Sequence, residues 1–287
     1  MRIFFVCQRV PFPPDRGDKI TTFNEIRHLS AQHEVHVFCL GDGRRDLDNI
    51  PGLSDYARSV TAVRLNERAS KLRALTALIA GRPLSVAAFA EPELHGAIKR
   101  KFIELKPDLI MVYSCNVAQF ADHFPQVPRI MQFAELDSSR WGQYARRSPI
   151  PLRWIYSIEQ RRFFAYERRI AHSFSHALVC TAFEQRDFER LIPGVAVSIV
   201  GNGVDLDYFR PVGDVKRPGS IVFTLGNDSA ISRVRSVELS STTIVSKSTP
   251  SCPTSDSRQA RRHASSLRAG TMTETGQPDT GCGATIA

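Results

Sequence analysis

The sequence predicts an α/β fold, a doubly wound parallel sheet followed by a poorly structured C-terminal tail. Short apolar runs rich in β-forming residues alternate with helical patterns along most of the chain. Several of these runs lack the polar alternation of a half-exposed strand, as expected for strands covered on both faces. Every aromatic residue lies at or before Phe223, and the alternation of strands and helices stops there.

The first apolar run, RIFFVC at residues 2–7, is the first predicted strand, and an amphipathic helix over residues 18–31 follows it. Asp18 is available as the N-cap of that helix. Its predicted apolar face carries Ile20, Phe23, Ile26 and Leu29. Further strands are predicted over 35–40, 60–65, 109–113, 129–133, 177–181 and 195–200, and further helices over 68–80, 91–105, 116–123, 152–172 and 183–191. This order favours the doubly wound arrangement, with an α+β fold of mixed strands as the alternative.

The composition indicates a basic protein of the cytoplasm. The net charge is +9, which attracts nucleic acid, anionic lipid or a phosphorylated sugar carrier without choosing among them. Four cysteines, Cys7, Cys39, Cys115 and Cys180, lie in or beside apolar runs and outside any zinc-like spacing, so we expect reduced, buried thiols. Neither the opening residues nor the apolar stretch 75–90 is long enough for a signal peptide or a membrane span. A metal site at His172 and His176 lacks a third ligand, and no metal is expected.

The loop PFPPDRGDK, residues 11–19, joins the first strand to the first helix. In an open parallel sheet, ligands bind at this end of the strands, where the helix start offers free N–H groups to an anion. Gly17 would let the backbone approach a phosphate, with Arg16 and Lys19 supplying charge and Asp18 beside them. The alternative is a turn in which Gly17 only permits a positive φ and Asp18 only caps the helix.

A second motif, SIVGNGVDLDYFRP at residues 198–211, is a turn by its chemistry alone. Its letters NGVDLDYFRP resemble a signature that closes the N-terminal domain of family 4 glycosyltransferases, and PFPPDRGDK resembles their opening loop. The segment WIYSIEQRRFFAYERRIAHSFSHALVCTAFEQRDF resembles the exosortase-associated exopolysaccharide sugar transferases. The resemblance covers roughly residues 1–224.

The resemblance implies a retaining, metal-independent transferase that moves a sugar from a nucleotide donor to a glycan or lipid-linked acceptor in exopolysaccharide biosynthesis. It implies a Rossmann-like GT-B N-terminal domain, with Arg16, Gly17, Asp18 and Lys19 at the donor phosphates. Asn202, Gly203 and Asp205 would form the hinge to a donor-binding domain. The nucleotide sugar is a co-substrate, and no other cofactor is implied.

The segment MQFAELDSSRWGQYA, residues 131–145, departs from the family pattern. Gln132 stands where relatives tend to carry an acid or a His facing the cleft, and Gln cannot act as a base. Glu135 or Asp137 would have to substitute as the catalytic carboxylate, or the site has decayed. The alternative is that both carboxylates only cap the next helix.

Two further features of the middle of the chain could be functional or structural. Glu159 and Glu167 have the E-x7-E spacing of the family's donor-binding motif, but they precede the NGVD signature, and Glu159 is expected to pair with Arg162. Residues 140–169 mix eight arginines with aromatic residues. This segment could lie on an anionic membrane at the inner face, or it could place its aromatic side chains in the core and its arginines in solvent. Nucleic-acid binding is not expected, because no recognised module surrounds the basic residues.

The resemblance predicts three regions: an acceptor-side domain over residues 1–215, the stub of a donor-binding domain over 216–224, and an aberrant low-complexity tail over 225–287. The tail is about one-third Ser and Thr and shows no sustained period, so we expect disorder. Because the donor-binding half is not recognisable, we expect a truncated and inactive transferase. The competing hypothesis is a non-enzymatic Rossmann-like module that binds a glycan, a membrane surface or a partner protein.

Overall fold

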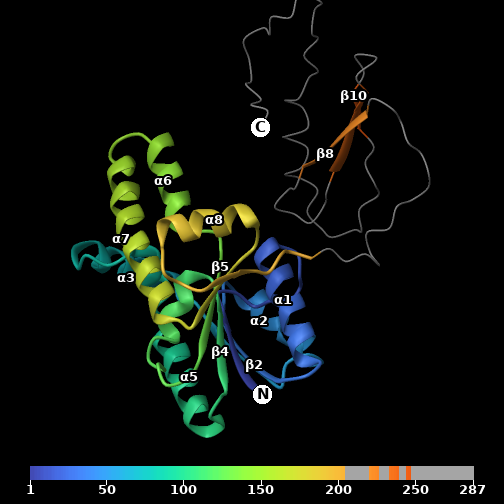
Figure 1. Cartoon of the computed structure of the whole chain (residues 1–287), viewed down its shortest axis with the longest axis vertical. Coiled ribbons are helices and arrows are strands. Elements are labelled where there is room, and N and C mark those ends of the chain that lie inside the picture. The colour runs from blue at the N-terminus through green and yellow to red at the C-terminus, as the bar shows by residue number, and fades with distance from the viewer. Residues whose placement is uncertain (204–219, 226–232, 239–243, 247–287) are drawn as a thin grey trace, which may run out of the picture. The chain divides into compact units, whose positions relative to one another are not determined.

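The computed structural model describes residues 1–203, 220–225, 233–238 and 244–246 (Figure 1). The chain divides into two compact units, Met1–Asp205 and Leu206–Ala287. The domain boundaries predicted from the sequence, at residues 215 and 224, stay a prediction. Asp205, predicted as a hinge residue, lies outside the described residues.

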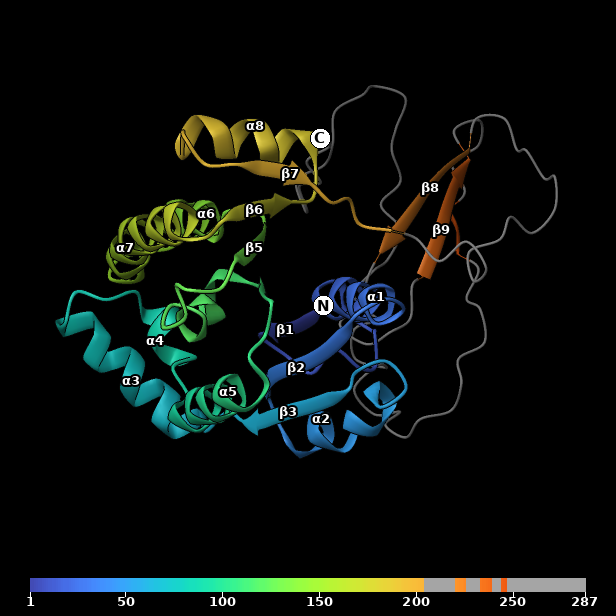
Figure 2. The same cartoon turned by 60° about the horizontal axis from the view of Figure 1, so that its bottom comes forward.

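The first unit is built on a seven-stranded sheet in the order β3-β2-β1-β4-β5-β6-β7, and every neighbouring pair in it is parallel (Figure 2). Its strands are β1 (Arg2–Cys7), β2 (Glu34–Gly41), β3 (Ser59–Arg64), β4 (Leu109–Tyr113), β5 (Arg129–Ala134), β6 (His176–Val179) and β7 (Val197–Ile199). The doubly wound parallel sheet predicted from the sequence is therefore confirmed.

Helices cover both faces of this sheet. They are α1 (Gly17–Ser30), α2 (Arg44–Asp48), α3 (Glu67–Ile79), α4 (Leu84–Ala88), α5 (Pro92–Leu105), α6 (Asp137–Arg147), α7 (Leu152–Ser173) and α8 (Ala182–Leu191), with 3-10 turns η1 (Ile50–Leu53) and η2 (Cys115–Phe120). The sequence predicted a helix over 116–123, where the chain forms the shorter η2. The elements α2, η1, α4 and α6 were not among the predicted ranges.

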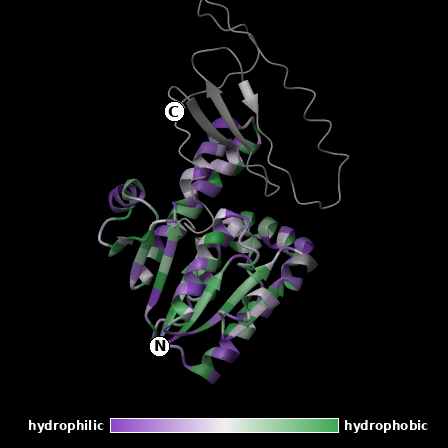
Figure 3. Cartoon of the chain, turned by 90° about the vertical axis from the view of Figure 1, so that its right-hand side faces the viewer, coloured by the Kyte–Doolittle hydropathy of each residue, from purple (hydrophilic) through white to green (hydrophobic). Residues whose placement is uncertain are grey.

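The alternation of side chains along β1 explains why its sequence is apolar throughout. Phe4 and Val6 join the cluster packed against α5, η2, α7 and α8, whereas Ile3 and Phe5 join the cluster packed against α1 and η1. Both faces of the strand are thus covered, and the strands form the hydrophobic middle layer in Figure 3. Burying one such phenylalanine contributes roughly 1.5–3 kcal/mol relative to leaving it exposed.

The first helix differs from its prediction in two details. Its buried face is centred on Thr22, Phe23 and Ile26, whereas Ile20 is 40% exposed. Its N-cap is Arg16, which makes no side-chain cap hydrogen bond, and Asp18 lies in the first turn instead of capping. Among the residues that the structure describes, no side chain caps the backbone N–H groups at this helix start.

The second unit contains a three-stranded antiparallel sheet in the order β10-β9-β8. Its strands are β8 (Ser220–Leu225), β9 (Arg233–Glu238) and β10 (Ile244–Ser246). β9 and β10 fall within the range 225–287 for which disorder was expected, and the rest of that range after Leu225 lies outside the described residues.

Candidate active site

The point where the strand order reverses lies between β1 and β4. On one side of this point the sheet continues from β1 to β2 and β3. On the other side it continues from β4 to β5, β6 and β7. In open α/β sheets the crevice at the carboxyl ends of such strands binds ligands. A small cavity of about 20 Å³ lies there, lined by Cys7, Gln8, Arg9, Asp18, Lys19, Thr22 and Tyr113.

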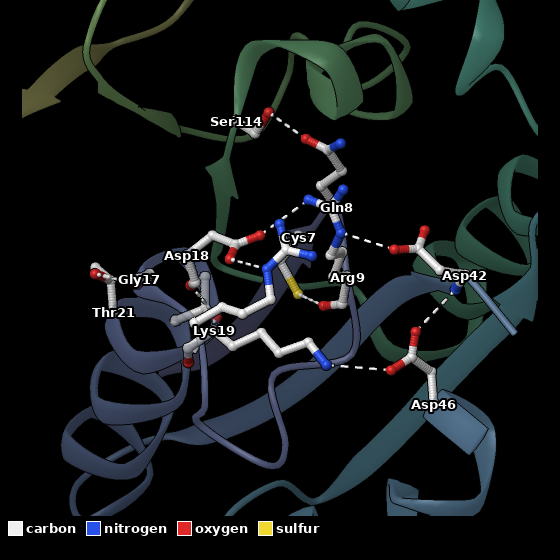
Figure 4. A network of polar contacts seen from close by, with 12 residues as sticks. Cys7, Gln8, Arg9, Gly17, Asp18, Lys19, Thr21, Asp42, Asp46 and Ser114 are labelled. Carbon is white, nitrogen blue, oxygen red and sulfur yellow. Dashed lines mark hydrogen bonds and ion pairs between the residues drawn. The ribbon is translucent and has the colours of Figure 1, made fainter. Parts of the chain in front are cut away.

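The carboxyl ends of β1 and β4 are joined by side chains at this crevice. The Ser114 hydroxyl donates to the Gln8 side-chain oxygen at 2.9 Å (Figure 4). Ser114 has φ of 80°, a conformation that costs a non-glycine residue on the order of 1–3 kcal/mol and that clusters at functional sites. Ala134, at the end of β5, also has a positive φ, of 55°, beside an irregularity in the pairing of β5 with β6. Two neighbouring strands thus end in strained backbone at the same edge.

A chain of ion pairs fixes the loop after β1. The Arg9 guanidinium bonds Asp18 at 3.0 Å and Asp42 at 2.9 Å (Figure 4). Asp46 accepts the backbone N–H of Asp42 at 3.0 Å and binds the Lys19 ammonium at 3.1 Å. Lys19 is only 6% exposed. Of the two cations predicted to serve the donor phosphates, Lys19 is therefore already held by a carboxylate, and a phosphate would compete with Asp46 for it.

Gly17 and Arg16 are more accessible than Lys19. The Arg16 side chain is 56% exposed, with its Nε 3.5 Å from Asp18. A Cβ added at Gly17 would meet no atom of the described residues within 4 Å. Gly17 does not have a positive φ, so the turn does not require glycine for its conformation. The open space over Gly17 and the uncapped N–H groups behind it form a surface suited to an anion.

Gln132 and Glu25 form a buried polar pair behind this surface. Gln132, at the end of β5, is completely buried, and within the described part of the chain neither its amide N nor its amide O has a hydrogen-bond partner. The two oxygens of Glu25, from α1, are buried and unpartnered in the same way. Burial raises the pKa of Glu25 to about 7, and the neighbouring Gln132 amide opposes part of that rise. A carboxyl group that titrates near neutral pH thus lies beside the residue predicted on the acceptor side.

The predicted catalytic carboxylates lie at the start of α6 and differ in environment. Glu135 is exposed and ion-paired with Arg140. Asp137 is 3.2 Å from Arg140, and burial raises its pKa to about 6. Neither residue is the N-cap of α6, which is Leu136, although Asp137 lies in the first turn. A carboxyl group with a pKa near 6 can exchange protons near neutral pH, so Asp137 is better tuned than Glu135 for acid–base work. Its catalytic role stays a prediction.

The two glutamates of the E-x7-E spacing are both buried in α7, and the expected pairing of Glu159 with Arg162 is wrong. Glu159 caps α4 instead, accepting the backbone N–H of Leu84 at 2.7 Å and that of Ser85 at 2.9 Å. Arg162 donates to backbone carbonyls, including that of Leu78 at 2.9 Å. Glu167 accepts the N–H of Ser138 at 3.3 Å, and burial, with the Asp137 charge as a smaller cause, raises its pKa to about 8.

Asn202, a predicted hinge residue near the end of the first unit, lies beside the first helix and β6. Its side-chain oxygen accepts the Thr21 hydroxyl of α1 at 3.2 Å and lies 3.7 Å from the Cys180 sulfur. Gly203 is exposed, with open space where a Cβ would stand. Asn202 thus lies against α1, four residues along from Gly17.

The comparisons with known proteins agree with this geometry. The sequence model of Glycosyltransferase Family 4 matches residues 17–208, which is more than half of the chain. The chain belongs to glycosyltransferase family 4. The match begins at Gly17 and includes the NGVD turn.

Among solved structures, one matches this family 4 chain with a TM-score above 0.5, and two others match with lower scores. A sucrose-phosphate synthase from Thermosynechococcus elongatus matches with a TM-score of 0.51 at 14% identity, over 74% of this chain and 51% of that one. The lipopolysaccharide outer core galactosyltransferase WaaB in its apo form gives 0.40 at 12% identity, over 72% and 47%. A UDP-glucose: anthocyanidin 3-O-glucosyltransferase in complex with UDP gives 0.40 at 8% identity, over 74% and 55%. The chain spans about half the length of these structures, and among curated proteins no sequence matches it.

The fold is therefore the Rossmann-like domain of a GT-B glycosyltransferase. The sequence indicated the loop before α1, Gln132 and Asn202. The structure has Gln132 near the carboxyl end of β5 and Asn202 in contact with α1. Glu25 and the strained Ser114 were not predicted. Glu25 could have been noticed as a charged residue one position before the buried Ile26, whereas no sequence signal marks the φ of Ser114. In the described ranges no three His, Cys, Asp or Glu side chains are placed to share a metal ion, and the expectation of a metal-independent site stays a prediction.

Proposed function

We propose that this family 4 chain serves sugar transfer from a nucleotide-sugar donor to a glycan or lipid-linked acceptor in exopolysaccharide biosynthesis, with retention of configuration. The single observation that carries the proposal is the uncapped start of α1 at Gly17, which opens at the switch point of the sheet. The leaving nucleoside diphosphate develops negative charge, and N–H groups at a helix start stabilise such charge.

In this proposal the described residues divide into two roles. Gly17 and its neighbours Arg16 and Asp18 border the donor phosphates, with the Lys19 charge shared with Asp46. Gln132 and Asp137 line the acceptor side. A buried carboxyl group such as Asp137, with its raised pKa, could take the proton of an incoming hydroxyl as the sugar–oxygen bond forms.

We further propose that the domain of residues 1–203 supplies one wall of the cleft and turns over negligibly without a donor-binding domain. GT-B catalysis takes place between two domains, and the described residues of the first unit form one of them. Asn202 and Gly203 would then be the point at which the second domain moves relative to the first.

The test is a fusion of residues 1–205 to the donor-binding half of a family 4 relative of known donor, made as an intact two-domain protein. The readout is release of the nucleoside diphosphate from that donor in the presence of a lipid extract or water as acceptor. We expect turnover by the fusion, negligible turnover by the chain alone, and at least tenfold loss in the fusion with Gly17→Leu. A folded fusion that releases no nucleotide would contradict the proposal and would favour a non-enzymatic binding module.

A further inference from the structure

The helices α6 and α7 form a hairpin whose tip projects past the carboxyl edge of the sheet (Figure 1). α7 has 22 residues, so it is about 33 Å long, and only part of that length lies over the sheet. The tip exposes three large apolar side chains: Ile150 is 62% exposed, Leu152 44% and Trp154 64%. Contiguous exposed apolar side chains rimmed by polar residues are typical of interaction surfaces.

The same tip is strongly basic. No Asp or Glu occurs between Ser138 and Ile158. Arg146, Arg147 and Arg153 are all exposed, and within the described part of the chain none of them lies within 4.0 Å of a carboxylate. By contrast, Arg140 at the base of the hairpin is paired with Glu135 and Asp137. The positive charge at the tip is therefore available to an external anion.

An open hollow of about 400 Å³ lies between the two helices beside this tip. It is lined by Gly142, Ala145, Arg146, Arg153, Ser157 and Gln160. Gly142 allows the close approach of the helices, since a Cβ there would lie 2.7 Å from the Gln160 side-chain nitrogen. The two guanidinium groups, with a hydroxyl and an amide beside them, provide the donors that a phosphate group accepts from.

We propose that this hairpin tip docks on an anionic phospholipid bilayer. Trp154, Leu152 and Ile150 enter the interfacial layer, and lipid phosphates bind Arg146 and Arg153 at the hollow. Apolar side chains flanked by unpaired arginines are the combination that anionic interfaces attract, because the burial of apolar area and the charge attraction act together. The inference deepens the proposed function and rests on it, because the tip lies at the sheet edge that carries the crevice, where a lipid-linked acceptor would arrive.

The test is flotation of the full chain with vesicles of phosphatidylcholine alone or with about one-third phosphatidylglycerol. We expect binding to the anionic vesicles and little to the neutral ones. Arg146→Gln with Arg153→Gln should weaken binding about thirtyfold, because each arginine near an anionic surface contributes about one factor of five. Leu152→Ser with Trp154→Ser should weaken it at least tenfold, and circular dichroism should confirm that each variant is folded.

Matched controls lie on α5, at the opposite end of the domain (Figure 1). Lys99→Gln with Arg100→Gln removes the same charge from exposed positions, and Ile103→Ser removes a side chain that is 76% exposed. Both should leave vesicle binding within about twofold of the unchanged protein. Equal losses in the α5 variants and the tip variants would show diffuse charge attraction and would overturn the inference.

A second readout locates the tip in the bilayer. The chain has two tryptophans, and Trp141 packs with the rings of Tyr144 and Tyr156, so Trp141→Phe leaves Trp154 as the single reporter. Its fluorescence should shift to shorter wavelength on anionic vesicles and be quenched by brominated acyl chains.

Three further outcomes would contradict the inference: no quenching by brominated acyl chains, no vesicle binding, or a loss confined to Leu75→Ser with Ile79→Ser. That last pair tests the exposed stripe on α3, where these residues are 59% and 86% exposed. Vesicle binding needs no nucleotide sugar, so failure here leaves the fusion assay for the proposed function unaffected.

Discussion

Replacing Glu159 by Ala removes the carboxylate with which α7 caps α4. The side chain is 1% exposed and accepts the N–H groups of Leu84 and Ser85 at 2.7 and 2.9 Å. Leaving a buried donor without a partner costs about 1–3 kcal/mol, and these two donors are only partly buried. We therefore expect the free energy of unfolding to fall by about 2–4 kcal/mol for Glu159→Ala and by about half of that for Glu159→Gln, which keeps one acceptor.

Urea unfolding followed by circular dichroism measures this change. With a slope near 2 kcal/mol/M, the Ala variant should unfold at a urea concentration about 1–2 M lower. The control is Glu104→Ala on α5, whose exposed side chain pairs with Lys101 and should change stability by less than about 0.5 kcal/mol. The reasoning is refuted if Glu159→Ala and Glu104→Ala unfold at the same urea concentration. If that variant instead lost nucleotide-sugar affinity at unchanged stability, the E-x7-E spacing would be a donor motif after all.

Three other predictions follow from single sites. Burial raises the pKa of Glu167 to about 8 in the folded protein, whereas an unfolded glutamate has a pKa of about 4.5. Between these pH values the unfolded state loses the proton and the folded state keeps it, so the free energy of unfolding falls as the pH rises. Glu167→Gln should therefore raise the free energy of unfolding by roughly 3–5 kcal/mol at pH 9 and by little at pH 4; a loss of stability at pH 9 would refute this. Gly17→Ala should leave stability unchanged or raise it by up to about 1 kcal/mol, because its Cβ meets no atom within 4 Å; a clear drop in thermal midpoint would show an unforeseen contact. Gly52→Ala should instead cost about 1–3 kcal/mol in urea unfolding, because its Cβ would lie 2.4 Å from the Phe12 ring, and stability equal to the parent would contradict that close contact.

Most of the fold was predictable because its signals are local. A strand such as β1, buried on both faces, is apolar at every position, and α1, α5 and α7 are long enough to show helical periodicity. The short elements α2, η1 and α4 were missed because they depend on tertiary contacts. α4 has five residues, and its start is capped by Glu159, about 75 positions along the chain.

The candidate site was predictable in its location but not in its chemistry. The rule that ligands bind at the carboxyl ends of parallel strands predicted a site at the loop before Gly17, whereas Gln132 and Asn202 were assigned from the family resemblance. The structure has Gln132 near the end of β5 and Asn202 in contact with α1, and their roles stay a prediction. The pairing of Lys19 with Asp46 was not predictable, because it depends on how the loop after β2 folds back on α1. The raised pKa of Glu25 likewise depends on its burial in the folded domain, which the neighbouring sequence does not reveal.

The uncapped start of α1 is most directly tested by titrating the isotopically labelled chain with the nucleoside diphosphate UDP and following backbone amide resonances. We predict saturable shifts that are largest at Gly17, Asp18 and Lys19, and that disappear in Gly17→Leu. Largest shifts on α5 or at the hairpin tip, or no shifts at millimolar UDP, would contradict the assignment of this crevice as the phosphate site.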